Sequence, residues 1–418
     1  MNILEDLEFR GLINQVSDQE GLEEKLEAGP VTLYCGFDPT ADSLHVGSLV
    51  PILTLRRFQE AGHKVIALVG GGTGLIGDPS FKAQERQLNT EDIVQEWSGK
   101  LKNQLSGMLK FEGDNPVKIV NNYDWLGGLS LIPFLRDVGK HLTVNYMMAK
   151  ESMKTRVDTG LSYTEFSYML LQAYDFLNLY EKEDCRLQIG GSDQWGNITA
   201  GLELIRRKGK GETAYTLTTP LVTKSDGKKF GKTEEGAIWL DADKTSPYEF
   251  YQFFLNTSDD DVVKLLKYFT FLSPYEINQL EVKVKTEPEK REAQRRLAEE
   301  VTKLVHSEEA LNQAIRISEA LFGGDISQLS AEEIKQGFKD VPSYTMETKE
   351  DIGIVDLLVN AGVSSSKRQA REDIQNGAIY INGERSQDLK RVIGVEDRIE
   401  DQFVVIRRGK KKYFLIQY

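Results

Sequence analysis

The chain has very few of the residues that build disulfides and metal centres. Two cysteines among 418 residues are too few for a disulfide framework or a cysteine-rich metal site. The four histidines are scattered and show no metal-ligand spacing. We therefore predict no metal ion held by the protein itself.

Long apolar runs are also missing. No stretch approaches the roughly 18 apolar residues that suggest a membrane helix. Residues 1–6 are acidic, whereas a signal peptide begins with a basic segment followed by an apolar one. These absences predict a cytoplasmic protein without a membrane partner.

Positive charge is in deficit over the chain as a whole. The 52 Lys and Arg residues face 65 Asp and Glu residues, so the net charge is −13. This balance argues against a protein that coats nucleic acid by charge alone, and we expect no DNA partner. Residues 351–418 differ, because they hold 12 Lys and Arg against 10 Asp and Glu. This weakly basic module predicts a local, shaped contact with a polyanion.

Strands and helices alternate in the first part of the chain. Continuous apolar segments predict buried strands at residues 31–36, 64–70, 117–121 and 186–189. Helical spacing of apolar residues predicts a helix over 47–60. Buried strands joined by helices indicate an α/β fold with a doubly wound parallel sheet, a Rossmann-like catalytic domain, whose ligands bind at the carboxyl ends of the strands.

The rest of the chain changes character several times. Charged, helix-favouring segments predict an all-helical domain, and the final segment predicts a small α+β module with a helix over 367–376 and a hairpin turn at Asn382-Gly383. The predicted boundaries are 1–220 for the Rossmann-like domain, 221–246 for a linker that carries a lysine loop, 247–322 for the helical domain, 323–350 for a second linker and 351–418 for the final module.

Two short segments have the chemistry of a polyphosphate site. Residues 37–48 place Thr40 and His45 between a strand and the N-terminus of a helix. Residues 229–233, Lys-Phe-Gly-Lys-Thr, form a glycine-containing loop with two lysines. A helix N-terminus and mobile lysines can hold a polyphosphate through an in-line displacement. A lone histidine is more often structural, but its place at a strand-to-helix transition favours a functional role for His45.

Two nucleotide-binding motifs match only superficially. Residues 72–77 fit G-x-G-x-x-G, yet they follow the second strand, and Asp78 directly after them would repel a pyrophosphate. We therefore reject a nicotinamide dehydrogenase and expect Asp78 to receive a substrate ammonium group. The loop around Lys232 is one residue short of a Walker A motif, so we reject that reading as well.

Polar residues interrupt two apolar segments. Tyr168, Gln172 and Asp175 recur at i, i+4 and i+7, which places them on one face of a helix over 163–179. A pocket lining or a solvated helix face would both explain this stripe. Asp193 and Gln194 follow two glycines at the end of the fourth strand, where they can bond ribose hydroxyls and the polar groups of an amino acid.

These segments together resemble the class I aminoacyl-tRNA synthetases, and in particular the bacterial tyrosyl-tRNA synthetases. The resemblance rests on residues 34–40, 77–80, 190–197 and 229–233 and runs over essentially the full chain. It implies that L-tyrosine reacts with Mg²⁺-bound ATP to give tyrosyl-adenylate, and that the tyrosyl group passes to tRNA(Tyr). It also implies a helical domain of the anticodon-binding type and a homodimer. The apolar stretch 131–148 is a candidate interface, although a core helix would look the same.

The resemblance also implies roles for individual residues. The tyrosine-binding residues would be Tyr34, Asp78, Tyr168, Gln172, Asp175 and Gln194. The ATP-binding residues would be Cys35, Asp38, Gly47, Ser48, Gly191, Asp193 and Lys232. The catalytic residues that act on the phosphates would be Thr40, His45, Lys82, Arg86, Lys229, Lys232 and Thr233.

The final module resembles an S4-type RNA-binding domain. The predicted tRNA-binding residues are Lys367, Arg368, Arg371, Arg407, Arg408, Lys410, Lys411 and Lys412. An ordinary charged surface remains the alternative for this set.

One residue departs from the family pattern. Ser48 stands where the family usually has a second histidine, and its shorter side chain reaches less far toward a nucleotide. Two alternatives to a tyrosine-specific enzyme also remain. A tryptophan-specific enzyme would not need the polar pair Tyr34 and Asp175, and an RNA-binding protein without activity would not need Thr40 and His45.

Overall fold

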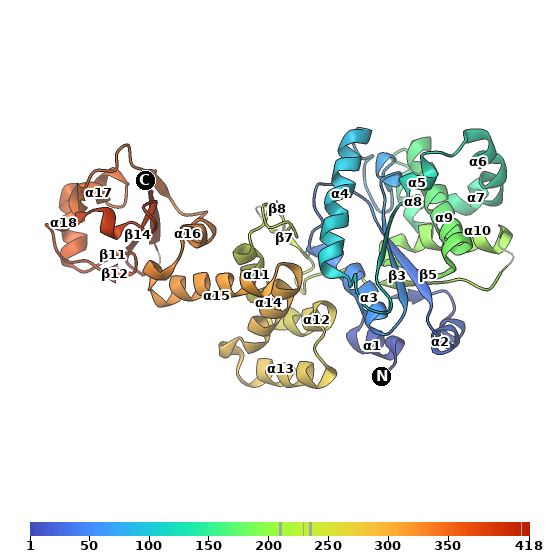
Figure 1. Cartoon of the computed structure of the whole chain (residues 1–418), viewed down its shortest axis with the longest axis horizontal. Helices are drawn as coiled ribbons and strands as arrows, with labels where there is room; N and C mark the ends of the chain where they lie inside the picture. Colours follow the sequence, from blue (N-terminus) through green and yellow to red (C-terminus); the bar gives the residue numbers. More distant parts are fainter. Residues whose placement is uncertain (209–210, 229, 234–235, 411) are drawn as a thin grey trace. The chain divides into compact units, whose positions relative to one another are not determined.

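The computed structural model describes residues 1–208, 211–228, 230–233, 236–410 and 412–418 (Figure 1). The described residues fold into two compact units, one made of Met1–Lys244 with Thr257–Leu297 and the other of Thr245–Asn256 with Ala298–Tyr418. Each unit has its own sheet and its own apolar core. No helix in the described chain is long and apolar enough to span a membrane.

A sheet of six strands organises the described part of the first unit. Its order is β1-β6-β5-β2-β3-β4, and its neighbouring strands are parallel except for β1, which is antiparallel to β6. The strands are β1 Gln15–Val16, β2 Thr32–Phe37, β3 Lys64–Val69, β4 Lys118–Asn121, β5 Cys185–Gly191 and β6 Tyr215–Thr219. The predicted parallel α/β fold and its four strands are confirmed, but β4 lies at the edge of the sheet and its residues are half-buried or exposed, whereas the sequence predicts a buried strand.

Helices cover both faces of this sheet. Figure 1 shows α3 and α4 on one face, with α9 and α10 on the other. The helices that surround the sheet are α1 Ile3–Arg10, α2 Gln19–Glu27, α3 Leu49–Glu60, α4 Glu91–Met108, α5 Tyr123–Leu126, α6 Leu131–Asp137, α7 Val144–Met148, α8 Glu151–Val157, α9 Tyr163–Glu183 and α10 Trp195–Lys208. This arrangement follows from right-handed crossovers that run in opposite directions from the centre of the sheet.

The lysine loop folds back as a short hairpin. Strands β7 Lys232–Thr233 and β8 Gly236–Ala237 pair antiparallel, with Lys232 opposite Ala237. Figure 1 shows this hairpin beyond the main sheet.

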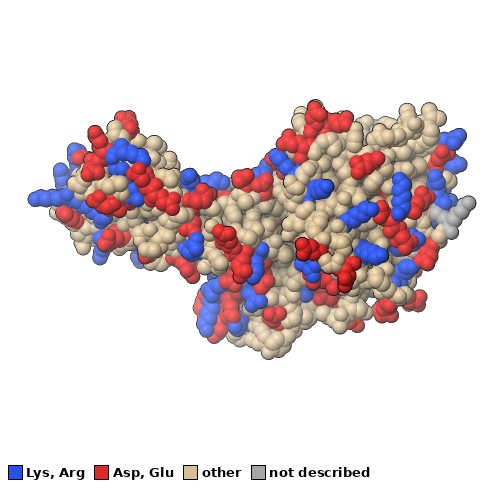
Figure 2. Space-filling model, viewed as in Figure 1, with Lys and Arg blue, Asp and Glu red and all other residues tan. Residues whose placement is uncertain are grey.

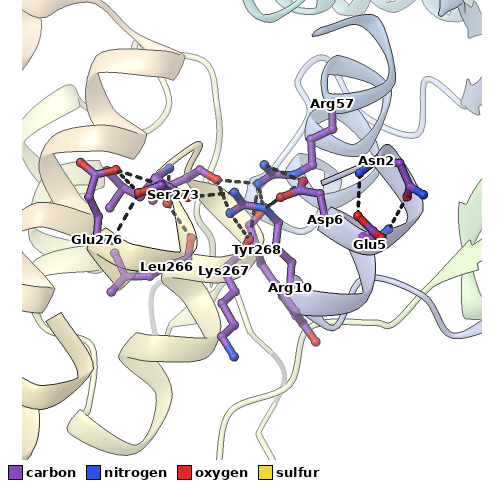
Figure 3. A network of polar contacts seen from close by, with 12 residues as sticks. Asn2, Glu5, Asp6, Arg10, Arg57, Leu266, Lys267, Tyr268, Ser273 and Glu276 are labelled. Carbon is purple, nitrogen blue, oxygen red and sulfur yellow. Dashed lines mark hydrogen bonds and ion pairs between the residues drawn. The ribbon is translucent and has the colours of Figure 1, made fainter. Parts of the chain in front are cut away.

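Two buried arginines join the Rossmann-like part of the first unit to its helical segment (Figure 3). Arg10 lies on α1, Arg57 lies on α3, and both are at least 96% buried. Arg57 donates to the carbonyl of Thr270 at 2.6 Å, and Arg10 donates to the carbonyl of Leu272 at 2.8 Å. These carbonyls follow the end of α12, where a helix leaves carbonyl groups without partners of its own. Three helices of this segment are α12 Asp259–Phe269, α13 Pro274–Thr286 and α14 Glu292–Val305, and the boundary between the units falls within α14.

The second unit combines helices with a five-stranded sheet of order β12-β11-β14-β15-β9. Its helices are α11 Pro247–Leu255, α15 Glu308–Gly323, α16 Ala331–Gly337, α17 Ile354–Asn360 and α18 Lys367–Gln375. Its strands are β9 Ser343–Thr345, β10 Ile352–Gly353, β11 Ile379–Ile381, β12 Glu384–Arg385, β13 Val392–Ile393, β14 Phe403–Arg408 and β15 Lys412–Gln417. Helices therefore occupy the region 247–322 as expected, but they are shared between the units, and the domain limits drawn from the sequence stay predictions.

The turn between β11 and β12 forms as the sequence predicts. Asn382 and Gly383 both have positive φ, 50° and 91°, which is the conformation of a tight hairpin turn. The close approach of Gly383 to the carbonyl of Gly324 leaves no room for a Cβ at this position.

Candidate active site

The segment before α3 and the segment after the lysine loop lie side by side. The amide of Val46 donates to the carbonyl of Ile238 at 3.0 Å, and the amide of Leu240 donates to that of Leu44 at 2.9 Å. Ile238 also donates to the carbonyl of Gly231 at 3.0 Å. The fold thus brings the two predicted phosphate-binding segments into one site, although they are far apart in the sequence.

The imidazole of His45 is hydrogen-bonded to the backbone of the turn that follows it. It caps the 3₁₀ turn Val46–Ser48, and its Nδ1 accepts the amide of Gly47 at 3.0 Å. A neutral imidazole whose Nδ1 accepts must carry its proton on Nε2. Burial, followed by the charges of Lys232 and Lys82, lowers the pKa of His45. The imidazole of His45 can therefore present a neutral N–H donor to an oxyanion.

Two lysines lie near enough to this histidine for their charges to add to the effect of burial on its pKa. Lys232 is exposed in β7, Lys82 is exposed after β3, and their charges lower the pKa of His45. The side chain of Arg86 lies over Gly77, where an added Cβ would be 3.4 Å from Cδ of the arginine. Lys229 lies outside the described residues, and Thr233 is described only through its backbone in β7. Thr40 is exposed at the carboxyl end of β2.

Asp38 lies with the predicted tyrosine-binding residues. Its carboxylate accepts the hydroxyl of Tyr168 at 2.5 Å and the hydroxyl of Thr73 at 2.7 Å. Burial raises the pKa of Asp38 to about 6, although both hydrogen bonds oppose the shift. This carboxylate therefore sits beside Tyr168, whereas the sequence predicts a contact with ATP.

A second carboxylate is surrounded by amides. Asp78 accepts the side-chain amide of Gln194 at 2.7 Å and that of Asn197 at 3.3 Å. It also accepts the backbone amide of Ser80 at 2.9 Å. These bonds hold the Asp78 carboxylate in place next to the Asp38 group, whose pKa its charge raises.

The deepest part of the site has a polar end. Tyr34 is 1% exposed and packs edge-on against Phe176 with ring centroids 5.5 Å apart. Its hydroxyl is buried and has no hydrogen-bond partner among the described residues. Burial, and then the charge of Asp175, raises the pKa of Tyr34. A buried hydroxyl without a partner beside a carboxylate is the arrangement expected where a ligand hydroxyl completes the bonding.

Asp175 is itself fixed by two donors from the segment after β4. Asn122 donates to its Oδ2 at 3.0 Å, and the indole of Trp125 donates to its Oδ1 at 2.8 Å. Burial raises the pKa of Asp175 to about 7 despite these two bonds. Asn122 also donates to the hydroxyl of Thr73 at 3.0 Å, so it connects Asp175 with the Asp38 group.

Two glutamines have further buried polar atoms that lack hydrogen-bond partners among the described residues. Gln172 donates to the side-chain carbonyl of Gln188 at 3.1 Å. The Oε1 of Gln172 and the Nε2 of Gln188 are buried without hydrogen-bond partners among the described residues. Tyr168, Gln172 and Asp175 therefore face one polar interior, and the alternative of a solvated helix face is wrong.

The ends of β2 and β5 form the third part of the site. Burial raises the pKa of the Cys35 thiol to about 12, so the thiol stays neutral. The backbone of Gly191 lies close to Asp193, because a Cβ there would be 2.7 Å from Oδ1 of Asp193 and would displace that side chain. Burial, followed by the charge of Asp78, raises the pKa of Asp193. Gly47 and Ser48 lie half-buried in the turn before α3.

Sequence reasoning missed several residues that hold this site together. They are Thr73, Asn122, Trp125, Gln188 and Trp239. Asn122 could have been found, because it directly follows the parallel strand β4, and ligands gather at the carboxyl ends of such strands. No group of three or more His, Cys, Asp or Glu side chains in the described chain could hold a metal ion.

The predicted tRNA-binding residues differ in their surroundings. Arg408 donates to the carbonyl of Val363 at 2.9 Å and pairs with Asp373 at 3.0 Å. Arg407 lies over the ring of Tyr380, with its guanidinium carbon 3.7 Å from the centroid. Those that are exposed and described are Lys367, Arg368, Arg371, Lys410 and Lys412, and Lys411 lies outside the described residues. Figure 2 shows basic and acidic side chains interspersed over this unit.

Two protein families match the chain in succession. Residues 26–323 match the tRNA synthetases class I (W and Y). Residues 333–416 match the tyrosine–tRNA ligase SYY-like C-terminal domain. The two matches together extend over most of both compact units.

Named relatives and solved structures agree with these families. The chain is 67% identical to a tyrosine–tRNA ligase of Bacillus velezensis over 419 residues, and 67% identical to one of Geobacillus stearothermophilus over 420 residues, with 100% of each chain covered. The structure of a C-terminally truncated Aspergillus nidulans mitochondrial tyrosyl-tRNA synthetase matches with a TM-score of 0.70 at 31% identity, covering 77% of this chain and 94% of that one. The chain therefore belongs, as its sequence predicts, to the bacterial tyrosine–tRNA ligases, which are class I aminoacyl-tRNA synthetases.

Proposed function

We propose that the polar interior at the carboxyl ends of β2, β3 and β5 is where this ligase activates L-tyrosine with ATP. The proposal rests on one observation: the polar groups at the two ends of this interior suit the two polar ends of tyrosine. At one end, the buried hydroxyl of Tyr34 lies beside Asp175, which suits a phenol. At the other end, Asp38 and Asp78 supply two carboxylates, which suit an ammonium group.

Each residue of this interior then has a role in binding tyrosine. The carboxylate of Asp175 accepts a hydrogen bond from the phenol hydroxyl of the substrate, and the hydroxyl of Tyr34 makes a second hydrogen bond to the same phenol oxygen. Asp78 and the hydroxyl of Tyr168 contact the ammonium group. The partner of Tyr168 is Asp38, whose carboxylate orients the hydroxyl from behind. Gln172 and Gln194 complete the polar contacts through side chains that are already held by neighbours.

The first chemical step needs positioning and charge stabilisation. An oxygen of the tyrosine carboxylate attacks the α-phosphorus of ATP, which enters as its Mg²⁺ complex, and the bond to pyrophosphate breaks. No side chain forms a covalent intermediate. The residues that stabilise the leaving pyrophosphate are Thr40, His45, Lys82, Arg86, Lys229, Lys232 and Thr233. The residues that hold the nucleotide are Cys35, Gly47, Ser48, Gly191 and Asp193.

The second step transfers the tyrosyl group to the 3'-terminal ribose of tRNA(Tyr). We assign the binding of this tRNA to the exposed basic residues of the final module. They are Lys367, Arg368, Arg371, Lys410 and Lys412. Arg407 contributes through its stacking on Tyr380, and Arg408 contributes by fixing α18 through Asp373. Lys411 belongs to the same proposal by its position in the sequence.

We also assign the chain to a cytoplasmic homodimer. Leu131 and Ile132 on α6 are 67% and 71% exposed, and Val144 on α7 is 62% exposed. Apolar side chains this exposed favour a partner surface. Ile132→Asp should therefore yield monomers in sedimentation equilibrium, whereas Val282→Asp, on the exposed face of α13, should leave the association state unchanged. Monomers in the unaltered chain would contradict the assignment.

Tyrosine-dependent exchange of labelled pyrophosphate into ATP tests the activation step without RNA. We expect exchange with tyrosine and none with phenylalanine or tryptophan, because a site built to bond a hydroxyl rejects an analogue that lacks it, as the tyrosyl enzyme is known to do. Exchange with tryptophan would overturn the assignment of Tyr34 and Asp175. If the folded protein shows no exchange with any amino acid, only an RNA-binding role without activation chemistry would remain.

A further inference from the structure

We infer that Trp239 is a positioning residue for His45, and that it links the lysine loop to this histidine during tyrosine activation. The inference rests on the proposed role of His45 at the phosphates. Trp239 follows β8 and forms an antiparallel bridge with His45. Its indole and the imidazole make an edge contact, with ring centroids 6.3 Å apart and planes at 75°.

The imidazole needs such a contact to keep a single orientation. Its Nδ1 accepts the amide of Gly47, but one hydrogen bond to an exposed ring still allows rotation about the side chain. The indole occupies a second side of the ring. With Gly47 and Trp239 both in contact, the Nε2 proton of His45 is aimed in a fixed direction, as a donor to phosphate requires.

Trp239 also contacts a lysine. The ammonium of Lys244 lies 4.7 Å from the centroid of the indole ring and forms an ion pair with Asp42. Asp42 lies three positions before His45, so the two segments are connected both at the indole and at this ion pair. A cation over an indole face is a favourable contact at a partly exposed site.

The backbone around Trp239 connects it to the lysine loop. Ile238, directly before it, donates to the carbonyl of Gly231, and its own carbonyl accepts the amide of Val46. Ile238 alone therefore carries hydrogen bonds to both phosphate-binding segments, and the indole of the next residue extends this link to the imidazole. A movement of Lys232 would be transmitted to His45 through Ile238 and Trp239.

A double-mutant cycle tests the inference directly. Pyrophosphate exchange is measured for the unaltered chain, Trp239→Met, His45→Ala and the double variant. We expect Trp239→Met to lower kcat about tenfold and to leave the KM for tyrosine unchanged, because misplacing a group that acts on the transition state costs rate rather than tyrosine affinity. In the His45→Ala background the same change should cost less than about twofold.

Two further variants separate positioning from general packing. Trp239→Phe keeps an aromatic ring and should retain kcat within about threefold of the unaltered chain. Trp97→Met removes a half-buried indole from α4 and should show no coupling to His45. Urea unfolding and tyrosine binding confirm folding, and Trp239→Leu replaces Trp239→Met in the cycle if the latter does not fold.

The possible failures are distinguishable. If Trp239→Met costs the same factor with and without His45, or raises the KM for tyrosine in parallel, the positioning role is wrong while the role of His45 stands. If His45→Ala alone leaves kcat unchanged, the proposed phosphate role of His45 fails, and the role of Trp239 fails with it.

Discussion

The backbone of Gly231 lies directly against Val46. Gly231 has a φ of 77°, and a Cβ at this position would overlap Cγ2 of Val46. The glycine between the two lysines of the loop is therefore required by contact with the residue that follows His45. Its conformation and its neighbour both exclude a side chain, and this close approach sets how near the loop can come to α3.

Gly231→Ala tests this approach, with Gly227→Ala as its matched control. Both glycines have positive φ, 77° and 79°, so both substitutions carry the same conformational cost of about 1 kcal/mol. A Cβ at Gly227 meets nothing within 4 Å. We expect Gly231→Ala to slow pyrophosphate exchange about tenfold or more, because it displaces the loop, and Gly227→Ala to change it little. Equal effects would show that the contact with Val46 does not position the loop.

Tyrosine binding should tighten as pH rises through the window of the buried carboxylates. Burial raises the pKa of Asp38 to about 6 and that of Asp175 to about 7. Bound tyrosine favours the ionised carboxylates, because its ammonium and phenol are donors. The dissociation constant, measured by equilibrium dialysis between pH 5.5 and 8, should therefore fall with rising pH. In Asp175→Asn the part of the change near pH 7 should disappear, and a constant affinity in the unaltered chain would contradict the assignment.

The same two carboxylates should weaken the free protein as pH rises. In the unfolded chain both titrate near the ordinary value of 3.8, whereas in the folded chain they hold their protons to about pH 6 and 7. Between pH 3.8 and these higher pKa values, the unfolded state binds fewer protons than the folded state. The contribution of the two carboxyl groups to the free energy of unfolding therefore falls as pH rises. Asp38→Asn should flatten the fall between pH 4 and 6 in urea unfolding. An unchanged slope would place the carboxylate in a more solvated setting.

Arg57 should contribute strongly to stability. Its side chain is buried, donates to Thr270 and lies 4.5 Å from the ring centroid of Phe271. Arg57→Met should lower the free energy of unfolding by about 2 kcal/mol, because the buried carbonyl of Thr270 loses its shorter hydrogen bond and keeps only the one from Arg10 at 3.1 Å. Arg206→Met, on α10 and with a side chain 69% exposed, should change it by less than about 0.5 kcal/mol. Equal losses would show that the buried arginine contributes no more than a surface one.

Ser48 should be tolerated in place of histidine. It lies half-buried in the turn before α3 and makes no side-chain hydrogen bond that caps this helix. We expect Ser48→His to change the rate of adenylate formation several-fold or less, because a water molecule can bridge a short side chain to the nucleotide. Stopped-flow fluorescence would measure this rate. A change of about a thousandfold, the size expected for loss of a main transition-state donor, would show that residue 48 is misplaced in the proposal.

The sequence by itself determined the parallel sheet, the order of its strands along the chain and the family. Buried strands such as 64–70 are continuously apolar, and local patterning of this kind does not depend on the rest of the fold. The stripe of Tyr168, Gln172 and Asp175 was also readable, because helical spacing alone places the three on one face. The Asn382-Gly383 turn belongs to the same class, since only a few residues adopt positive φ.

Only the tertiary structure decided which polar groups meet. Asp38 forms hydrogen bonds with Tyr168 and Thr73 because α9 packs near the carboxyl ends of β2 and β3. Asn122 reaches Asp175 for the same reason, and Trp239 reaches His45 because a backbone bridge joins distant segments. Contacts of this kind depend on strand order and close packing. A sequence pattern records spacing along one element, and it carries no information about which side chain from another element will stand opposite.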